Sequence, residues 1–569
     1  MHNKEIIRIL NLTASLLELY GENQFKVRSY QTAVYNLERT GLELDRLDRN
    51  ALAELPGVGK SIAATIDEIN HTGNSGTLDN LLKQTPPGIV ELLKVKGIAA
   101  RRIKTAWDHL GIENADQLYA AALKGQLAEL PGFGAKTQDR IEKILEYHLL
   151  SQGMIHYKDA HLQGLQLEEL IFQQFPEARL SRTGDFRRKL EVVKGLEYLW
   201  ALENFQVAEE FLNNTGEFIR DPHLSGPFRW RGEIAERSRK LDIRFCNPGQ
   251  FGNKLVYYTG NEQHLLLKNE NGTQLQELVD RSFEDEKAVY EALGWPLIIP
   301  ELREGCHELE FVKSDHQWQV LQPEDLKGIL HCHSTYSDGK NSLEEMALAC
   351  KALGYEYFGI SDHSQTAVYA NGLDTDRILL QRDEIERLNQ ELVPFKIFRG
   401  IESDILNDGS LDYSEEVLKT FDFIVASVHS NINMDIEQAT GRLIRAIENP
   451  HTTILGHPTG RQLLKREGYP IYHEKVIDAC ARNNVIIEIN AHPWRLDLDW
   501  RWVRQAMEKG VLISINPDAH EIAGLKDVLY GVNVARKAGL TPEMTFNALG
   551  ADQIEQHFKR RKGEAAKSR

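Results

Sequence analysis

The chain has 569 residues, of which 41% are hydrophobic, and a formal net charge of −17. This length predicts three or four domains, and the lack of an apolar run of 18 residues argues against a membrane-spanning helix. The five cysteines form no Cys-x-x-Cys pair, which argues against a disulfide framework and a zinc ribbon. The N-terminus "MHNKEIIRIL" lacks the layout of a signal peptide, so we expect a cytoplasmic protein without a membrane partner.

The negative charge is unevenly distributed along the chain. Residues 1–150 have 18 basic and 19 acidic residues, a net charge of −1. Residues 151–324 have a net charge of −9, and residues 325–569 a net charge of −7. Because proteins hold nucleic-acid phosphates mainly with Lys and Arg, the middle segment is the least suited to that role.

Residues 1–150 have a helical pattern with three similar glycine turns, "ELPGVGKSIAATI", "LLKVKGIAARRIKTAW" and "ELPGFGAKTQDRIEKIL". One such turn is weak evidence, because Gly commonly ends helices. Three turns, each followed by a helix with basic residues, favour helix-hairpin-helix motifs that contact the DNA backbone. The middle copy lacks its second glycine. The candidate DNA-binding residues are Gly57, Gly59, Lys60, Gly97, Arg101, Arg102, Gly132, Gly134 and Lys136.

Between about residues 160 and 262 the pattern predicts short strands, among them "FRRKLEVVKGLEYLWAL", "SRKLDIRFC" and "KLVYYTG". A mixed segment follows to about residue 320, and "LQPEDLKG" has the composition of a linker. From residue 328 the chain alternates strands and helices, with seven mostly apolar strands of the kind that helices cover on both sides. This alternation predicts an incomplete or distorted α/β barrel of seven units.

Each of the seven predicted strands ends in residues that commonly bind metals. In an α/β barrel these strand ends meet at one mouth, so imidazoles and carboxylates from distant segments would converge. Such ligands without thiolates suit Zn²⁺, Mn²⁺ or Fe, and clustered ions favour hydrolysis of phosphate esters. The candidates are His331, His333, Asp338, Asp362, His363, Glu402, His429, His457, Glu488, His492, Asp518 and His520.

The segments "HCHSTYSDG", "SDHS", "GIESDI", "SVHS", "GHP" and "NPDAH" resemble the motifs of the PHP (polymerase and histidinol phosphatase) domain. The resemblance implies a (βα)7 barrel with three metal ions, in which Glu402 bridges two of them. It also implies that Glu488 and His492 are not ligands. Arg461 could hold a phosphate or be a solvated charge. The implied ligands are His331, His333, Asp338, His363, Glu402, His429, His457, Asp518 and His520, with His331, His333, Glu402 and Asp518 as the catalytic set.

With hairpin motifs in front and a PHP barrel behind, nearly the whole chain resembles bacterial family X DNA polymerases. The resemblance implies a lyase-like helical domain (1–85), a fingers-like domain (86–155), a nucleotidyltransferase palm (156–262), a thumb (263–320) and a PHP domain (326–569). The predicted fold is therefore an all-α helix-hairpin-helix region, an α+β palm and thumb, and a C-terminal α/β barrel.

The palm motifs depart from the family pattern at the positions that carry polymerase chemistry. The family's Asp-x-Asp falls on Gly195 and Glu197, which leaves Asp242 as its matching third carboxylate. Two-metal nucleotidyl transfer needs bridging carboxylates, so the resemblance implies a degenerate polymerase site. Thr65 stands where a lyase lysine is expected. The residues of the degenerate site are Gly184, Asp185, Arg187, Arg188, Gly195, Glu197, Asp242, Tyr257, Tyr258 and Gly260.

The leading hypothesis is a DNA repair enzyme, for example in base excision repair, that acts as a metal-dependent 3′–5′ exonuclease through its PHP domain. The expected cofactors are up to three divalent ions, Mn²⁺ or Zn²⁺, with Mg²⁺ as an alternative. The expected partner is gapped or 3′-ended DNA bound by its backbone to a monomer. Three other hypotheses stay open: a gap-filling polymerase, a phosphatase of the histidinol phosphate type, and a non-catalytic DNA-end scaffold.

Overall fold

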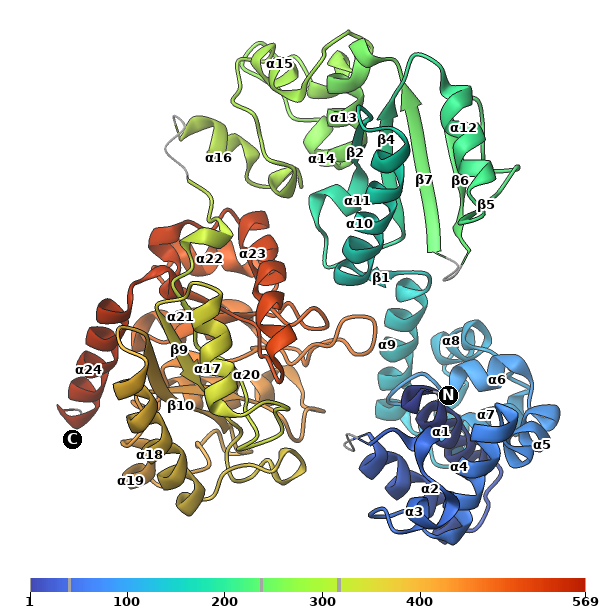
Figure 1. Cartoon of the computed structure of the whole chain (residues 1–569), viewed down its shortest axis with the longest axis vertical. Helices are drawn as coiled ribbons and strands as arrows, with labels where there is room; N and C mark the ends of the chain where they lie inside the picture. Colours follow the sequence, from blue (N-terminus) through green and yellow to red (C-terminus); the bar gives the residue numbers. More distant parts are fainter. Residues whose placement is uncertain (1, 39–41, 236–238, 315–318, 568–569) are drawn as a thin grey trace. The chain divides into compact units, whose positions relative to one another are not determined.

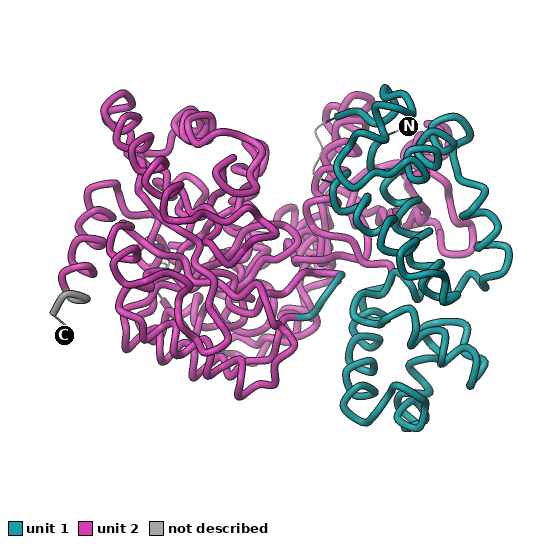
Figure 2. The backbone as a smooth tube through the Cα atoms, turned by 90° about the horizontal axis from the view of Figure 1, so that it is seen from below, with its two compact units in different colours: residues 1–152, 465–467 teal, residues 153–464, 468–569 magenta. Residues whose placement is uncertain are grey.

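The computed structural model describes residues 2–38, 42–235, 239–314 and 319–567 (Figure 1). The chain forms two compact units, residues 1–152 with 465–467, and residues 153–464 with 468–569 (Figure 2). In the part of the chain that the structure describes, no helix is long and apolar enough to cross a membrane. The finer division into five domains stays a prediction.

The first unit is all helical, as the sequence predicts, and its helices share one hydrophobic core. In the first helix, for example, Ile6, Leu10 and Leu17 recur at helical spacing and are buried. The helices are α1 (Asn3–Leu19), α2 (Gln24–Leu37), α3 (Arg49–Ala53), α4 (Lys60–Thr72), α5 (Gly76–Gln84), α6 (Pro87–Leu92), α7 (Ala100–Leu110), α8 (Ala115–Leu123) and α9 (Ala135–Ser151).

The second unit begins with a mixed five-stranded sheet in the order β2-β4-β7-β6-β5. Strands β4 and β7 are parallel, and the other neighbours are antiparallel. The strands are β2 (Arg179–Arg182), β4 (Leu196–Ala201), β5 (Phe218–Arg220), β6 (Arg229–Ile234) and β7 (Arg239–Cys246). One face packs Tyr198, Trp200, Trp230 and Ile243 into a core. By the alternation of side chains, the other face has polar residues as well as a second small core that includes Leu199 and Cys246. The sequence predicts a palm for this segment.

The predicted strand at "KLVYYTG" is wrong, because residues Phe251–Thr259 form helix α13. Tyr and Val favour strands in isolation, but tertiary packing decided the outcome. Phe251, Leu255, Val256 and Thr259 are buried at helical spacing, so burial of one helix face overrides the local preference. The start of the predicted strand "FRRKLEVVKGLEYLWAL" is also helical, as part of α11 (Gly184–Arg188).

Apart from α10 and α12, the remaining elements before the barrel are short. A small hydrophobic core that includes Val256, Tyr290 and Trp295 packs the segment after α13. These elements are β1 (Ile155–His156), α10 (Tyr157–Gln174), β3 (Val192–Val193), α12 (Phe205–Asn214), α14 (Glu262–Leu265), α15 (Glu286–Glu291) and α16 (Glu308–Lys313).

The predicted seven-stranded barrel is confirmed, with seven parallel strands in the order β14-β13-β12-β11-β10-β9-β8. Hydrogen bonds from His333 N to Ala519 O (2.9 Å) and from Asp518 N to His331 O (3.1 Å) join the two edges. The barrel is therefore nearly closed. Its strands are β8 (Gly328–Ile329), β9 (Tyr357–Ile360), β10 (Lys396–Asp404), β11 (Phe423–Ser427), β12 (Ile454–Leu455), β13 (Ile486–Asn490) and β14 (Ile513–Asn516).

Helices lie between successive barrel strands and cover the barrel (Figure 1). Strands β11 and β13 are buried along their whole length, which explains why most of their residues are apolar. The helices are α17 (Leu343–Ala352), α18 (Thr375–Glu391), α19 (Glu415–Leu418), α20 (Ile436–Ile447), α21 (His473–Asn483), α22 (Trp500–Glu508), α23 (Val528–Lys537) and α24 (Ala551–Lys567).

Candidate metal centre

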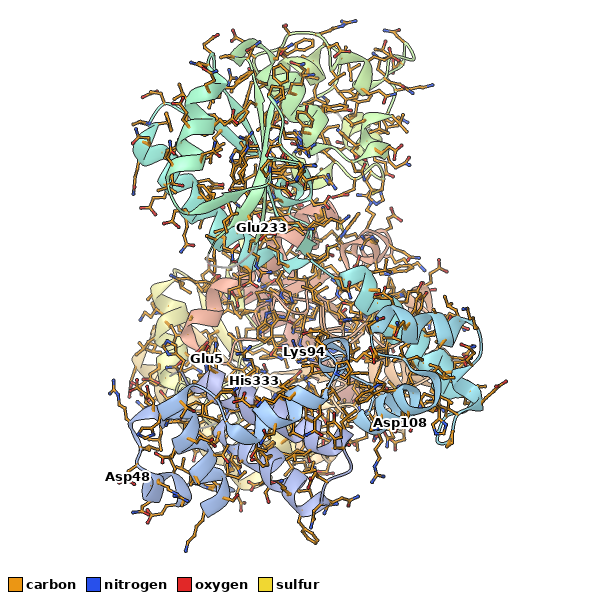
Figure 3. The ribbon with its side chains drawn as sticks, turned by 90° about the vertical axis from the view of Figure 1, so that its right-hand side faces the viewer. Glu5, Asp48, Lys94, Asp108, Glu233 and His333 are labelled. Carbon is orange, nitrogen blue, oxygen red and sulfur yellow. The ribbon has the colours of Figure 1, made fainter. Side chains whose placement is uncertain are left out.

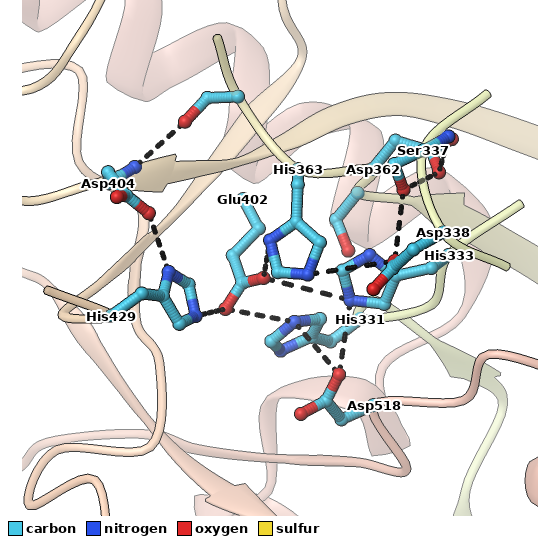
Figure 4. Close-up of polar contacts among 12 residues, drawn as sticks. His331, His333, Ser337, Asp338, Asp362, His363, Glu402, Asp404, His429 and Asp518 are labelled. Carbon is cyan, nitrogen blue, oxygen red and sulfur yellow. Dashed lines mark hydrogen bonds and ion pairs between the residues drawn. The ribbon is translucent and has the colours of Figure 1, made fainter. Parts of the chain in front are cut away.

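The nine predicted ligands lie together at the carboxyl ends of the barrel strands. Figure 4 labels all of them except His457 and His520. Their ligand atoms form three overlapping groups, each within 4.8 Å. The groups are His333, Asp338, His363 and His520; His331, His333 and Asp518; and His363, Glu402 and His429. His457 joins them through its Nε2, which lies 3.0 Å from Oε1 of Glu402. The barrel topology thus brings together residues from six separate segments.

Glu402 on β10 lies at the centre of the cluster and is almost completely buried. Its Oε1 is 3.0 Å from His457 Nε2, 3.2 Å from His429 Nε2 and 3.4 Å from His331 Nε2. Its Oε2 faces a second set of imidazoles, 2.9 Å from His363 Nδ1 and 3.7 Å from His333 Nε2. The two oxygens of Glu402 therefore face two different sets of candidate ligands.

Several buried polar atoms of the cluster fit a bound metal. His331 Nε2 and Glu402 Oε2 are buried and make no hydrogen bond to any described residue. Such atoms are costly unless a partner such as a metal ion satisfies them. Burial and the neighbouring His520 and His363 lower the pKa of His333 to about 3, so its imidazole is neutral and free to donate a lone pair. The donor set of imidazoles and carboxylates suits Zn²⁺ or Mn²⁺.

A second layer of carboxylates orients the imidazoles. His331 Nδ1 lies 2.7 Å from Glu488 Oε1, and His429 Nδ1 lies 2.5 Å from Asp404 Oδ1. Both contacts leave the Nε2 atoms directed at Glu402. Glu488 also accepts a hydrogen bond from the backbone N of His457 at 2.8 Å. This carboxylate–histidine arrangement fixes the tautomer and ring orientation of metal ligands.

Two of the predicted ligands have strained backbones. The φ angles of His457 and Asp518 are 22° and 52°, in the left-handed region that non-glycine residues rarely adopt. Such strain persists only where the surrounding structure imposes it, and it clusters at functional sites. At His457 and Asp518 it accompanies side chains directed into the cluster.

Arg461 is neither a phosphate ligand nor a solvated charge in this structure. Its side chain donates to Asp499 Oδ2 (2.5 Å) and to the carbonyl of Arg495 (2.8 Å), so its hydrogen-bonding capacity is used within the protein. Arg495 instead lies beside the cluster, with Nε 3.6 Å from Asp518 Oδ2. Arg495 was not among the predicted site residues. Its place in the loop after Glu488 and His492, which end a strand, was the available signal.

Tyr369 borders the cluster, and Trp494 packs against His492, which is outside the ligand set. Tyr369 is 46% exposed, and its ring centroid lies 6.1 Å from that of His363 and 6.4 Å from that of His429. Trp494 is 57% exposed, with its ring 5.4 Å from that of His492. Burial lowers the pKa of His492 to about 4, and its ring packs against Trp494 rather than joining the three ligand groups. The mouth therefore combines candidate metal ligands with exposed aromatic surface.

The positions predicted for a degenerate polymerase site come together on the mixed sheet. Glu197 on β4 is the register partner of Asp242 on β7. Gly195 precedes β4, and a Cβ added there would lie 2.5 Å from the carbonyl of Lys240, so the backbone leaves no room for a side chain. Arg244 Nη1 lies 3.2 Å from Glu197 Oε2, and Nη2 lies 3.6 Å from Asp242 Oδ2. The guanidinium thus lies between the two carboxylates.

Two further arginines contact Asp242. Arg229 donates through Nε at 2.8 Å, and Arg231 donates through Nε at 3.0 Å. The sequence analysis missed all three arginines. The alternation "RWR" on β6 and "DIR" on β7 was the available signal, because it puts these residues on one face of the sheet.

The arginine pair of "TGDFRR" is held by carboxylates. Arg187 donates to both oxygens of Glu286 at 2.7 and 2.5 Å. Arg188 donates to Glu304 at 3.0 Å and to Asp185 at 2.5 Å, so Asp185 is paired rather than isolated. Despite burial, Arg303 and Arg187 lower the pKa of Glu286 to about 2.

The residues of the "YYTG" match lie at the end of α13 and meet α11 there. Arg187 donates to the Thr259 hydroxyl at 2.9 Å, and Arg188 donates to the Thr259 carbonyl at 2.6 Å. Tyr258 packs under the Arg244 guanidinium at 4.7 Å, whereas Tyr257 is exposed. Packing therefore gathers the motif residues that are distant in sequence.

The three glycine turns of the first unit have the same geometry. Gly57, Gly97 and Gly132 have φ angles of 74°, 97° and 79°, and each precedes the start of α4, α7 or α9 by three residues. None of these three helices has a side-chain cap at its N-terminus. Their first backbone N–H groups are therefore available to an anion. Lys60 and Lys136 lie in the first turns and are exposed.

Comparison with known proteins assigns three segments of the chain. A family model described as a helix-hairpin-helix domain matches residues 1–75, a SAM-like helix-hairpin-helix tandem matches residues 89–145, and a PHP domain matches residues 330–492. The chain is 35% identical over 574 residues to the DNA polymerase/3′-5′ exonuclease PolX of Bacillus subtilis (strain 168), which covers 98% of this chain and all of that protein.

Part of the chain also matches shorter proteins. The chain is 30% identical over 185 residues to a "Probable phosphatase" of Thermoanaerobacter sp. (strain X514), covering 31% of this chain and 73% of that protein. It is 26% identical over 245 residues to a "Probable phosphatase" of Acetivibrio thermocellus, covering 41% of this chain and 95% of that protein.

Proposed function

The chain belongs to the PolX family, and from this membership we propose that it is a metal-dependent 3′–5′ exonuclease acting on DNA through its PHP barrel, with polymerase activity lost. The observation that carries the proposal is the convergence of nine imidazole and carboxylate side chains at one barrel mouth. The carboxylates of the mixed sheet, in contrast, are paired with arginines. The barrel is therefore the part of the chain equipped for phosphodiester hydrolysis.

The nine clustered residues would hold divalent ions, Mn²⁺ or Zn²⁺, which lower the pKa of bound water and clamp phosphoryl oxygens. Glu402 would hold two ions through its two oxygens. Glu488 and Asp404 keep the imidazoles of His331 and His429 in one tautomer. Arg495, one-fifth exposed beside Asp518, is positioned to bind a non-bridging oxygen of the scissile phosphate.

Two sets of features support DNA as the substrate: the glycine turns of the first unit and the exposed aromatic rings near the barrel mouth. The three glycine turns offer uncapped helix N-termini, which bind phosphates without regard to base sequence. Tyr369 and Trp494 offer exposed rings on which unpaired bases stack. These features favour a DNA end over a small phosphate monoester as the substrate.

A small-molecule phosphatase is the second candidate, because the barrel is similar to proteins named as probable phosphatases. The deciding experiment compares two substrates on the full-length protein with Mn²⁺. One is a 5′-labelled oligonucleotide with a free 3′ end, and the other is histidinol phosphate. We expect stepwise shortening of the oligonucleotide and little phosphate release. Preferential phosphate release would favour the phosphatase, and no activity on either substrate with an empty metal site would favour a DNA-end scaffold.

Replacing Glu488 with glutamine is expected to weaken metal binding and activity by about 10–100-fold. Glutamine keeps the shape of the side chain but removes the charge that orients His331. The measurement is the Mn²⁺ concentration needed for half-maximal cleavage. Glu448→Gln, an exposed carboxylate after α20, is the matched control. An unchanged Mn²⁺ dependence in Glu488→Gln would contradict the orienting role.

Replacing Lys60 and Lys136 together with alanine is expected to reduce the salt dependence of DNA binding by about two units of slope, because each lysine neutralises about one phosphate. The measurement is anisotropy of labelled duplex DNA over a series of salt concentrations. Lys143→Ala, exposed farther along α9, is the control. Equal slopes for the double variant and the control would argue against DNA contact at these turns.

A further inference from the structure

The face of the mixed sheet opposite its main core has three arginines on neighbouring strands. Side chains alternate along β6 and β7, so Trp230, Leu241 and Ile243 enter the core. Arg229 and Arg231 of β6 and Asp242 and Arg244 of β7 lie on the opposite face, beside Glu197 of β4. Glu233, two residues beyond Arg231 on the same strand, is labelled in Figure 3 and helps to locate this face. We call Arg229, Arg231 and Arg244 the arginine face.

The arginine face has more positive than negative charge. Three guanidinium groups surround two carboxylates, Asp242 and Glu197. Despite burial, Arg229 and Arg244 lower the pKa of Asp242, so Asp242 is ionised. Burial, together with the nearby Asp242 and Asp185, raises the pKa of Glu197 despite Arg244. Over these five side chains the excess of positive charge is therefore at least one; Glu233, farther along β6, is not among them.

The register of the strands adds a second indication. Arg229 and Arg244 are direct cross-strand partners in the antiparallel pair β6–β7. Like charges in this position destabilise a sheet unless an anion lies near both. Asp242 supplies one such anion from within the protein, but its two oxygens are shared among three guanidinium groups.

Donor groups remain available on the arginine face. Arg229 uses Nε and Nη2 to contact Asp242, and Arg231 uses Nε. Within the described residues, the structure assigns no partner to Nη1 of Arg229 or to either Nη of Arg231. Both side chains are 33% exposed. Guanidinium groups with free N–H pairs bind phosphate oxygens in bidentate geometry.

We propose that the arginine face binds a phosphodiester group of DNA without a metal ion. Arg244 occupies the space between Glu197 and Asp242, where a metal-dependent palm would hold a cation. Arg229 and Arg231 present their remaining N–H groups to one phosphate of the strand. The sheet thereby holds DNA by direct contacts and needs no divalent ion to do so. This inference goes beyond the proposed hydrolysis at the barrel and does not depend on it.

The test uses the full-length protein with EDTA, which prevents cleavage. Fluorescence anisotropy of a labelled gapped duplex gives the DNA affinity and its salt dependence. Arg229→Gln/Arg231→Gln is expected to bind about tenfold more weakly, with a salt slope smaller by about one. Arg220→Gln is the matched control, because Arg220 lies on β5 of the same sheet but pairs with Glu209 of α12. Its affinity is expected to equal that of the unchanged protein.

Three outcomes would overturn the proposal: unchanged affinity of the double variant, an equal loss in Arg220→Gln, or DNA binding at this face that requires Mg²⁺. Arg231→Lys keeps the positive charge but removes the paired N–H groups of the guanidinium, so an intermediate affinity is expected. This variant serves as the test if the double variant fails to fold. Mn²⁺-dependent cleavage of a short oligonucleotide is measured in parallel. If the double variant binds DNA more weakly but cleaves normally, the result supports the arginine face. If the unchanged protein does not cleave at all, the result contradicts the proposed hydrolysis at the barrel and leaves the arginine face untouched.

Discussion

Replacing His333 with alanine is expected to abolish Mn²⁺-dependent shortening of a 3′-ended oligonucleotide, by about 10³-fold or more. His333 belongs to two of the three ligand groups and is completely buried. Its ring centroid lies 4.1 Å from that of His520 and 4.4 Å from that of His363. Alanine removes a ligand that these groups share. The measurements are product length on a denaturing gel and the metal content of the purified protein.

The control for this variant is His451→Ala. His451 belongs to the same barrel but precedes β12, so it lies at the amino ends of the strands, away from the metal-binding mouth. It should keep both activity and metal. Asp518→Asn provides a second test if His333→Ala unfolds, because it keeps the shape of the side chain. If His333→Ala cleaves at a rate near that of the unchanged protein, the barrel is not the site of cleavage.

Incorporation of a labelled deoxynucleotide into a gapped duplex is expected to stay at background with either Mg²⁺ or Mn²⁺. A two-metal site requires carboxylates that hold Mg²⁺ in octahedral geometry. Here Gly195 offers no ligand, and Arg244 lies between the two carboxylates that remain. Arg187 and Arg188, which match the triphosphate motif, are held by Glu286 and Glu304.

The assay is best performed in the His333→Ala background, so that trimming does not hide extension. Asp242→Ala should be indistinguishable from its parent. Gly195→Asp combined with Glu197→Asp should not restore incorporation, because a Cβ at position 195 would meet the carbonyl of Lys240. Extension that disappears in Asp242→Ala would show that the site still works, and it would make the gap-filling polymerase the better hypothesis.

The candidate metal centre was accessible from the sequence for a topological reason. Each predicted strand is followed by its polar residues, and parallel strands direct their carboxyl ends to one mouth. The grouping of His331 with Asp518, 187 positions later, therefore needs no knowledge of side-chain packing. The outer carboxylates were harder to assign. Their contacts depend on side-chain rotamers and strand register. Glu488 contacts His331, and Asp404 contacts His429.

The mixed sheet shows the opposite situation. Its segment has the most negative net charge of the three, which led us to expect poor phosphate binding. Charge summed over a segment does not report where charges lie in space. Pairing of β6 with β7 puts Arg229, Arg231 and Arg244 on one face around Asp242. The local charge there is positive although the segment as a whole is acidic.

Arg461 and the "KLVYYTG" segment illustrate the same limit. The sequence allowed a phosphate contact or a solvated charge for Arg461, whereas the fold pairs it with Asp499 and leaves it 16% exposed. The Val and Tyr residues of "KLVYYTG" favoured a strand, whereas packing of Leu255 and Val256 produced a helix. In both cases the deciding partners come from other parts of the chain.

By itself the sequence determined the helical first unit, the seven-unit barrel and the set of residues at its mouth. These features follow from hydrophobic periodicity, glycine turns and the order of strands, all of which are local patterns repeated along the chain. Only the tertiary structure decided which arginines neutralise Asp242, which arginine lies beside the metal ligands and how Gly195 excludes a side chain. These depend on cross-strand register and close packing, which arise from contacts between distant residues.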